Sequence, residues 1–297
     1  MTQGTAASGR RELGTGHLWV EEGKSGGLKS EAGARVAGSH AELSGSPPVD
    51  RGGSGAEASD GPALLLLHGL GATGEVWAGL RGLLDGRWPG RWVIPDLRGH
   101  GRSSQAAAYS FGQHAADLAG LFRPGERVVV VGHSMGGVVG LALASGWFGV
   151  EVAGVLGIGI KVSWTQAELA RAADLAARPV RWFDGRDEAA ARFLRVAGLE
   201  GLAPLDGELV ASGLVSEGGR WRLAADPATM AVGAPDMAGF LAAARAPARL
   251  ACGQSDGLVT VDELRHHDPG AIQLTGLGHN AHVEDPEWVL RLAEQAT

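Results

Sequence analysis

The sequence has very little of several residues that commonly carry function. Cys252 is the only cysteine among 297 residues, which excludes an internal disulfide and any zinc site with two or more cysteine ligands. No apolar run approaches the roughly 18 residues of a membrane span, and the N-terminus lacks the apolar stretch of a secretory signal. Clusters of Lys and Arg are also missing, and the net charge is −7. These absences predict a cytoplasmic protein with neither nucleic acid nor a membrane as its partner.

The remaining composition is that of a globular protein with ample core material, 44% hydrophobic and 20% charged. The first part, residues 1–61, is rich in glycine and serine and predicts one short strand in HLWVEE, residues 17–22. From residue 23 to 60 no periodicity is sustained, so we expect a disordered insertion there.

Short apolar runs alternate with amphipathic stretches from residue 62 onward. Runs that are nearly all apolar are typical of parallel strands buried on both faces of a doubly wound α/β sheet. A glycine-rich loop follows most of these runs, and ligands in such sheets bind beyond the carboxyl ends of the strands. The predicted strands are 63–67, 91–96, 127–131 and 150–159, with two more at 247–252 and 271–274.

The alternation stops between residues 161 and 245. Helical stretches occur there at 164–183 and 186–199, and no convincing strand appears before residue 247. An interruption of this kind is typical of an inserted helical cap. We therefore predict that residues 62–160 and 246–297 form an α/β core and that residues 161–245 form the cap.

One serine lies at a predicted turn from strand to helix, in Gly132-His133-Ser134-Met135-Gly136. This segment fits the G-x-S-x-G nucleophile elbow in the context that the motif requires. The turn forces the serine backbone into a strained conformation, and glycines on either side avoid steric conflict. The elbow lifts the serine Oγ above the sheet and directs the positive end of the next helix at the reacting oxygen.

A serine hydroxyl is too weakly acidic to act unaided, so it needs a base and a carboxylate that orients the base. Asp256 follows the predicted strand 247–252 by four residues, and His279 follows strand 271–274 by five. Both lie in loops at the same edge of the sheet as Ser134. The order Ser, Asp, His is the one known for catalytic triads on this kind of sheet.

Five segments, in order, resemble the signature loops of the α/β-hydrolase superfamily and specifically its cap-bearing members: LLLLHGLGATGEVW, PDLRGHGRSS, VGHSMGG, CGQSDGLVT and GLGHNAHVEDPEWV. The resemblance covers residues 62–297, with weak matching in the cap. It implies a mostly parallel sheet with an inserted helical cap. It also implies that His279 is the base, that Asp256 orients it, and that the backbone N–H groups of Leu70 and Met135 form the oxyanion hole.

Other residues compete for two of these roles. His282 is an alternative base, but it begins the next predicted helix, and the family pattern favours His279. Asp262 and Glu263 are alternatives to Asp256, although both read as first-turn carboxylates of a helix. No cluster has metal-site spacing, and GLGATG (69–74) is not a full G-x-G-x-x-G motif. We therefore expect neither a metal nor a nicotinamide cofactor.

Residues around the site give weaker signals. His68 and His100 are expected to shape their loops through hydrogen bonds. Asp96 is expected to anchor its loop through backbone N–H groups or Arg98. Aromatic residues of the cap either line an apolar pocket or hold the cap on the core. The candidates for the substrate pocket are His68, Gly69, His133, Trp164, Trp182 and His282.

A serine at the elbow favours acyl-enzyme chemistry, whereas relatives that hydrolyse epoxides or haloalkanes have aspartate there. The sequence therefore predicts a serine esterase that cleaves an ester-like bond of a small, largely apolar substrate. It contains no charged cluster that would predict an anionic substrate. Two alternatives stay open, because fold and triad do not fix the reaction. The same triad serves acyl transfer, perhydrolysis or carbon–carbon cleavage, and a chain of this kind can also be a ligand-binding protein without catalysis.

Overall fold

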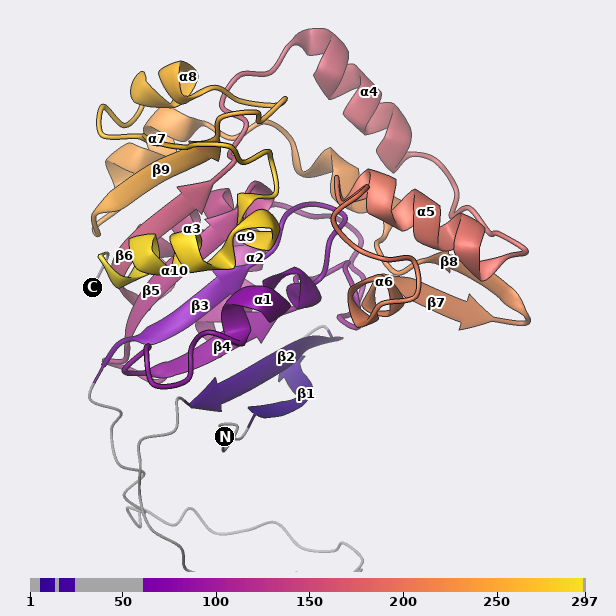
Figure 1. Ribbon diagram of the computed structural model, residues 1–297, viewed down its shortest axis with the longest axis horizontal. Coiled ribbons are helices and arrows are strands. Elements are labelled where there is room, and N and C mark those ends of the chain that lie inside the picture. The colour runs from indigo at the N-terminus through magenta and orange to yellow at the C-terminus, as the bar shows by residue number, and fades with distance from the viewer. Residues whose placement is uncertain (1–5, 14–15, 25–60, 296–297) are drawn as a thin grey trace, which may run out of the picture.

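The computed structural model describes residues 6–13, 16–24 and 61–295 (Figure 1). Eight strands form one sheet in the order β1-β2-β4-β3-β5-β6-β9-β10. β1 and β2 pair antiparallel with each other and β2 pairs antiparallel with β4, whereas the six strands from β4 to β10 are parallel. The bounds are β1 Ala6–Leu13, β2 Gly16–Lys24, β3 Ala63–Leu67, β4 Arg91–Pro95, β5 Arg127–His133, β6 Glu151–Ile158, β9 Ala248–Gly253 and β10 Ile272–Leu274.

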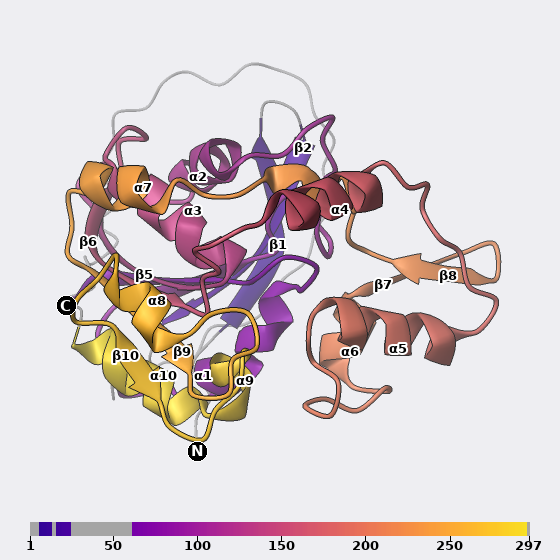
Figure 2. The same cartoon turned by 90° about the horizontal axis from the view of Figure 1, so that it is seen from above.

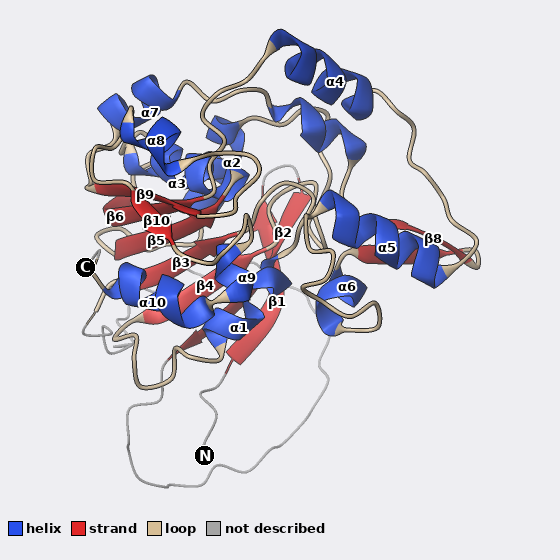
Figure 3. Cartoon of the chain, turned by 45° about the horizontal axis from the view of Figure 1, so that its top comes forward, coloured by secondary structure: helices blue, strands red, loops and turns tan. Residues whose placement is uncertain are grey.

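Helices cover both faces of the sheet (Figure 3). Side chains of β3 alternate between two core clusters: Leu65 and Leu67 pack with α2, α3, α7 and α8, while Leu64 and Leu66 pack with α1, α9 and α10. The doubly wound fold predicted from the apolar runs is therefore confirmed. The helices are α1 Ala78–Arg81, preceded by the 3-10 turn η1 Gly74–Trp77, then α2 Phe111–Ala119, α3 Met135–Ala144, α7 Met237–Ala243, α8 Val261–Arg265, α9 Ala281–Glu284 and α10 Pro286–Glu294.

The segment between β6 and β9 begins with elements that lie to one side of the sheet, at the right of Figures 1 and 2. In chain order these are α4 Gln166–Ala176, α5 Arg186–Val196, α6 Glu208–Ser212, β7 Leu214–Glu217, β8 Arg220–Leu223 and the 3-10 helix η2 Pro227–Val232. The chain then returns to the sheet, since α7 follows η2 and Met237 is buried in the core.

Two expectations about strands were wrong. A strand pair, β7–β8, lies inside the segment for which no strand was predicted. Its strands are four residues long and only partly buried, and neither contains an apolar run that would predict a strand. The sequence signal for the hairpin was the pair Gly218-Gly219, whose positive φ angles of 58° and 79° form the turn. The N-terminal region contains β1 as well as the predicted β2. β1 was missed because AASGRREL is a mostly exposed edge strand.

The disordered insertion predicted for residues 23–60 falls almost entirely outside the described residues; Gly23 and Lys24 belong to β2. Among the described helices, none is both long enough and apolar enough to cross a membrane.

Candidate active site

Ser134 forms the junction between β5 and α3, with φ 49° and ψ −117°. It is the one non-glycine residue of the described chain that has a positive φ, a conformation that costs about 1–3 kcal/mol. The neighbouring packing explains why the turn needs glycine. A Cβ on Gly132 would clash with the backbone of Gly136, and a Cβ on Gly136 would clash with the carbonyl oxygen of Leu67. The N–H of Ser134 donates to the carbonyl of Ile158 at 2.7 Å, which ties the elbow to the end of β6.

The loop after β3 passes directly over this elbow. A Cβ built on Gly69 would lie 3.3 Å from Cβ of Ser134 and 2.7 Å from Nδ1 of His133, so only glycine fits there. The next residue, Leu70, lines the same cavity as Ser134 and Met135. Met135 begins α3, whose first-turn N–H groups have no partner within the helix. Two elements therefore bring candidate backbone donors to the mouth of the elbow.

His279 and Asp256 meet at the carboxyl ends of β10 and β9. Nδ1–H of His279 donates to Oδ2 of Asp256 at 2.9 Å, with Oδ1 at 3.1 Å. The Asp256 side chain is fully buried, and its Oδ1 also accepts the N–H of Leu258 at 2.8 Å. Because a carboxylate can only accept, this pair fixes the proton on Nδ1 and leaves Nε2 of His279 as the nitrogen able to act as a base.

His279 packs against the elbow. Nε2–H of His133, the residue before Ser134, donates to the His279 carbonyl at 3.0 Å, and the two rings lie 4.6 Å apart. Gly159, one residue beyond β6, also faces the imidazole, because a Cβ there would lie 3.1 Å from Nδ1 of His279. Within the described residues Ser134 Oγ is not hydrogen-bonded to the imidazole; such contacts often form only when substrate is bound.

The alternative base is packed in the core against His133, with their ring centres 4.3 Å apart. His282 is 1% exposed, its two ring nitrogens have no hydrogen-bond partner, and its ring packs 4.5 Å from that of Trp77. The alternative acids have structural roles on α8: Glu263 forms a capping box with Thr260, and Asp262 pairs with Arg265. None of the three contacts the Asp256–His279 pair through a hydrogen bond or ion pair in the described structure.

Five histidines are buried in the core, and one of them, His68, joins two loops next to the site. His68 donates from Nδ1 to the carbonyl of Gly69 and accepts the N–H of Leu97 at Nε2, both at 2.8 Å. Burial lowers the pKa of His68 and His114 to about 4 and that of His100 and His282 to about 3, and it lowers the pKa of His133 far below its usual value. All five side chains are therefore neutral near pH 7.

Asp96 anchors its loop through backbone N–H groups, as expected, accepting from Gly74 at 2.8 Å and from Arg102 at 2.9 Å. Arg98 was the wrong alternative partner. It pairs instead with Asp117 on α2, at 2.6 Å and 2.7 Å. Arg98 lies only two residues after Asp96 in the loop, and the spacing does not show in which direction the Arg98 side chain points.

A cavity of about 280 Å³ opens above Ser134, between the core and α4. Apolar side chains from both sides line most of it, together with the charged Lys161, Glu168 and Arg171. Lys161 and Glu168 pair at 3.0 Å. Of the six residues expected in the substrate pocket, only Trp164 lines this cavity. His68, Gly69, His133 and His282 are buried and do not line it.

Trp182 does not line the cavity either. It lies beneath the guanidinium groups of Arg222 and Arg220, at 5.7 Å and 6.0 Å from the ring centre. Nothing in the sequence shows which face of the β7–β8 hairpin Trp182 would cover. No group of three or more His, Cys, Asp or Glu in the described parts of the chain is placed to hold a metal ion.

Residues 64–292 match the family model of the alpha/beta hydrolase family. The chain belongs to this family. The resemblance of the signature loops is thereby confirmed, and the protein is a hydrolase by family.

An uncharacterized protein of Mycobacterium tuberculosis is 40% identical over 90 residues, which are 29% of this chain and 26% of that protein. The magnesium-chelatase 30 kDa subunit of Rhodobacter capsulatus is 43% identical over 90 residues, 29% of this hydrolase and 31% of that subunit.

Solved structures share the fold over nearly the whole chain. E-2-(acetamidomethylene)succinate hydrolase superposes with a TM-score of 0.71 at 22% identity, covering 98% of both chains. The thioesterase domain from the curacin biosynthetic pathway gives 0.70 at 18% identity, covering 97% of this hydrolase and 99% of that domain. A novel esterase from Mycobacterium tuberculosis gives 0.64 at 20% identity, with 99% and 92% covered.

Proposed function

We propose that this hydrolase is a serine esterase with Ser134, His279 and Asp256 as its catalytic triad. The observation that carries the proposal is the Asp256–His279 pair, packed through His133 and Gly159 against a strained serine elbow at the same edge of the sheet. A buried carboxylate that fixes the tautomer of a histidine beside a serine that lines a cavity is the arrangement that nucleophilic acyl chemistry requires.

In the proposed reaction, Ser134 Oγ attacks the carbonyl carbon of an ester while Nε2 of His279 takes the hydroxyl proton. The N–H groups of Leu70 and Met135 stabilise the oxyanion that forms, each contributing about 3–4 kcal/mol. His279 then gives its proton to the departing alkoxide, leaving an acyl-enzyme and a free alcohol. A water that gives its proton to His279 attacks the acyl-enzyme, and collapse of the second tetrahedral intermediate releases the acid and restores Ser134.

The cavity supports a small substrate with a largely apolar part near the scissile bond. Its volume of about 280 Å³ is at the small end of ligand pockets. Leu70, Val138, Ile160 and Val232 offer hydrocarbon surface close to Ser134. Esters of short to medium acyl chains therefore suit it best.

The test uses p-nitrophenyl butyrate and a fluorophosphonate probe. Ser134→Ala is expected to abolish both turnover and labelling while the thermal unfolding midpoint stays within a few degrees of wild type. Ser163→Ala is the matched control, since Ser163 is exposed at the start of the inserted segment, and it is expected to keep full activity. Turnover by Ser134→Ala equal to that of wild type would overturn the proposal. Adding an alcohol to the wild-type reaction measures how much of the acyl-enzyme goes to acyl transfer.

A further inference from the structure

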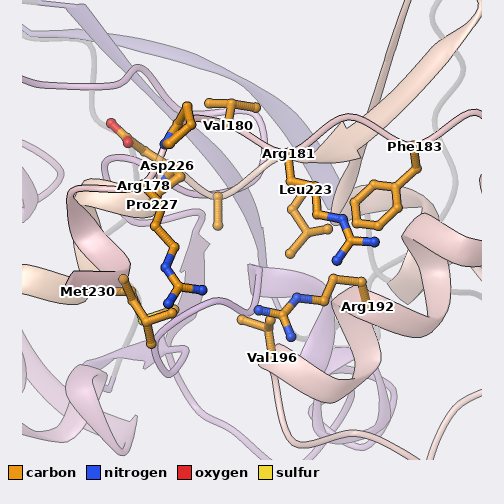
Figure 4. Close-up of a pocket in the computed structure, with 13 residues that line it drawn as sticks. Arg178, Val180, Arg181, Phe183, Arg192, Val196, Leu223, Asp226, Pro227 and Met230 are labelled. Atoms are coloured by element: carbon orange, nitrogen blue, oxygen red, sulfur yellow. The ribbon is translucent and has the colours of Figure 1, made fainter. Parts of the chain in front are cut away.

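A second cavity, of about 190 Å³, lies beside the catalytic one in the inserted segment. Arg178 lies just beyond α4, Arg181 lies in the following loop and Arg192 lies on α5, and all three line this arginine pocket (Figure 4). Leu175 and Met230 line both cavities, so the arginine pocket and the space above Ser134 adjoin at these two apolar side chains.

The positive charge in the arginine pocket is largely unneutralised. Within the described chain, the guanidinium groups of Arg178 and Arg192 make no hydrogen bond or ion pair. Arg181 pairs with the exposed Glu188 at 3.0 Å and lies 4.5 Å over the ring of Phe183. Arg178 and Arg181 are exposed and Arg192 is half-buried, so solvent weakens their mutual repulsion, but the three guanidinium groups still give the cavity a positive potential that attracts an anion.

The one carboxylate that lines the pocket, Asp226, is committed elsewhere. Its Oδ2 accepts the hydroxyl of Tyr109 at 2.7 Å, and its Oδ1 accepts the N–H of Ala228 at 3.0 Å. Figure 4 shows this carboxylate directed away from the guanidinium groups of Arg178 and Arg192. Asp226 therefore shapes the wall of the pocket without pairing with its arginines.

We propose that the arginine pocket binds an anionic group, a carboxylate or phosphate, at the end of the substrate distant from the scissile bond. The planar, permanently charged guanidinium matches the paired oxygens of such groups. The side chains of Leu175 and Met230 would contact the hydrocarbon part that connects this group to the carbonyl at Ser134. The inference rests on the proposed function and narrows its substrate class to acyl compounds with a distal anion.

The sequence contains no charged cluster that would indicate an anionic substrate, whereas the structure brings three arginines to one cavity. Arg178, Arg181 and Arg192 are spread over fifteen positions of the sequence, and only the reversal of the chain between α4 and α5 brings them to one cavity. The spacing of the three arginines along the sequence does not predict this reversal of the chain.

The test compares two series of p-nitrophenyl esters, from succinate to dodecanedioate. In one series the distal group is a free carboxylate, and in the other it is the isosteric primary amide. Wild type is expected to favour the carboxylate over the amide in kcat/KM by about tenfold to a hundredfold at its best chain length.

Arg192→Gln and Arg178→Gln are each expected to reduce this carboxylate-to-amide ratio of kcat/KM at least about fivefold. Arg195→Gln is the matched control on the same helix, because Arg195 pairs with Glu200 at 3.2 Å outside the pocket, and it is expected to keep the ratio. A wild-type ratio near one at every chain length, or a ratio retained by the double variant R178Q/R192Q, overturns the proposal.

A binding experiment separates failure of the pocket from failure of the esterase. Ser134→Ala protein is titrated calorimetrically with free dicarboxylates and with alkyl phosphates, so that the better-bound series identifies the preferred anion. Binding that is lost in S134A/R192Q and kept in S134A/R195Q supports the pocket even if wild type hydrolyses no ester. Absence of binding by both series overturns it even if wild type is an active esterase.

Discussion

Replacing Asp256 by asparagine tests the proposed triad while changing only one atom of the buried side chain. In the wild-type structure Oδ1 accepts the N–H of Leu258 at 2.8 Å, and Oδ2 accepts Nδ1–H of His279 at 2.9 Å. Leu258 N–H can bond only to the amide oxygen of asparagine, so the amide NH₂ must face His279. That NH₂ is a donor, and it stabilises the tautomer of His279 that carries its proton on Nε2.

An imidazole with its proton on Nε2 cannot accept the proton of Ser134. General-base catalysis typically contributes about 10²–10⁴-fold, and we expect D256N to lose most of that range. A loss of about 10³–10⁴-fold in kcat corresponds to about 4–5.5 kcal/mol of transition-state stabilisation. The assay is p-nitrophenyl butyrate hydrolysis together with the rate of fluorophosphonate labelling.

Folding should be nearly unaffected by D256N, because asparagine keeps the bond to Leu258 and fills the same volume. Asp262→Asn provides the matched control, since Asp262 is exposed on α8 and, among the described residues, forms an ion pair only with Arg265; its activity is expected to equal that of wild type. If D256N retains activity within tenfold of wild type while folded, the reasoning from tautomer to base is refuted, and Asp256 is then a structural residue only.

Three further predictions concern packing, pH and the choice of base. Gly136→Ala places a methyl group against the Leu67 carbonyl and is expected to lower the free energy of unfolding by about 3 kcal/mol in urea titrations. Gly112→Ala is the control: it has open space around it in α2 and is expected to raise the free energy of unfolding by about 0.5 kcal/mol. Equal stabilities of the two variants would contradict the clash at Gly136. The pKa of His114 is about 4 when folded and 6.5 in the unfolded chain, so the unfolded state binds the proton first and stability falls as pH drops from 6.5 to about 4. His114→Leu should therefore reduce the slope of unfolding free energy against pH by up to about 1.4 kcal/mol per unit in that window, and an unchanged slope would show that His114 is not buried as described. His279→Gln is expected to reduce kcat at least about 10³-fold and His282→Phe at most about tenfold, and the reverse order would make His282 the base.

The sequence predicted the sheet and the neighbourhood of Ser134 because these depend on local patterns. The apolar run of β5 and the glycines around Ser134 are dictated by burial on two faces and by close backbone approach, and both leave marks on adjacent residues. The ends of parallel strands meet at one edge, so placing Asp256 and His279 just after their strands was enough to bring them together.

The inserted segment was harder to predict because its contacts join residues far apart in the chain. Whether Trp182 faces the substrate or Arg222, and whether Arg178 and Arg192 share a cavity, depends on how α4, α5 and the β7–β8 hairpin fold over one another. No period of two or 3.6 residues encodes those choices. β7 and β8 show this most clearly, since their four-residue strands have no apolar run of their own.

The position of α7 has a consequence for how this hydrolase can be modified. β6 and β9 are adjacent parallel strands, and α7 joins them across the face that α3 also covers, as the crossover helix of an ordinary β–α–β unit does. The elements from α4 to η2 are therefore a detour within one connection, leaving near Ile160 and returning near Asp236. We expect these two points to serve as splice junctions, at which the segment from another family member can replace this one. Such a chimaera would keep the sheet and the Asp256–His279 pair and acquire the other protein's selectivity.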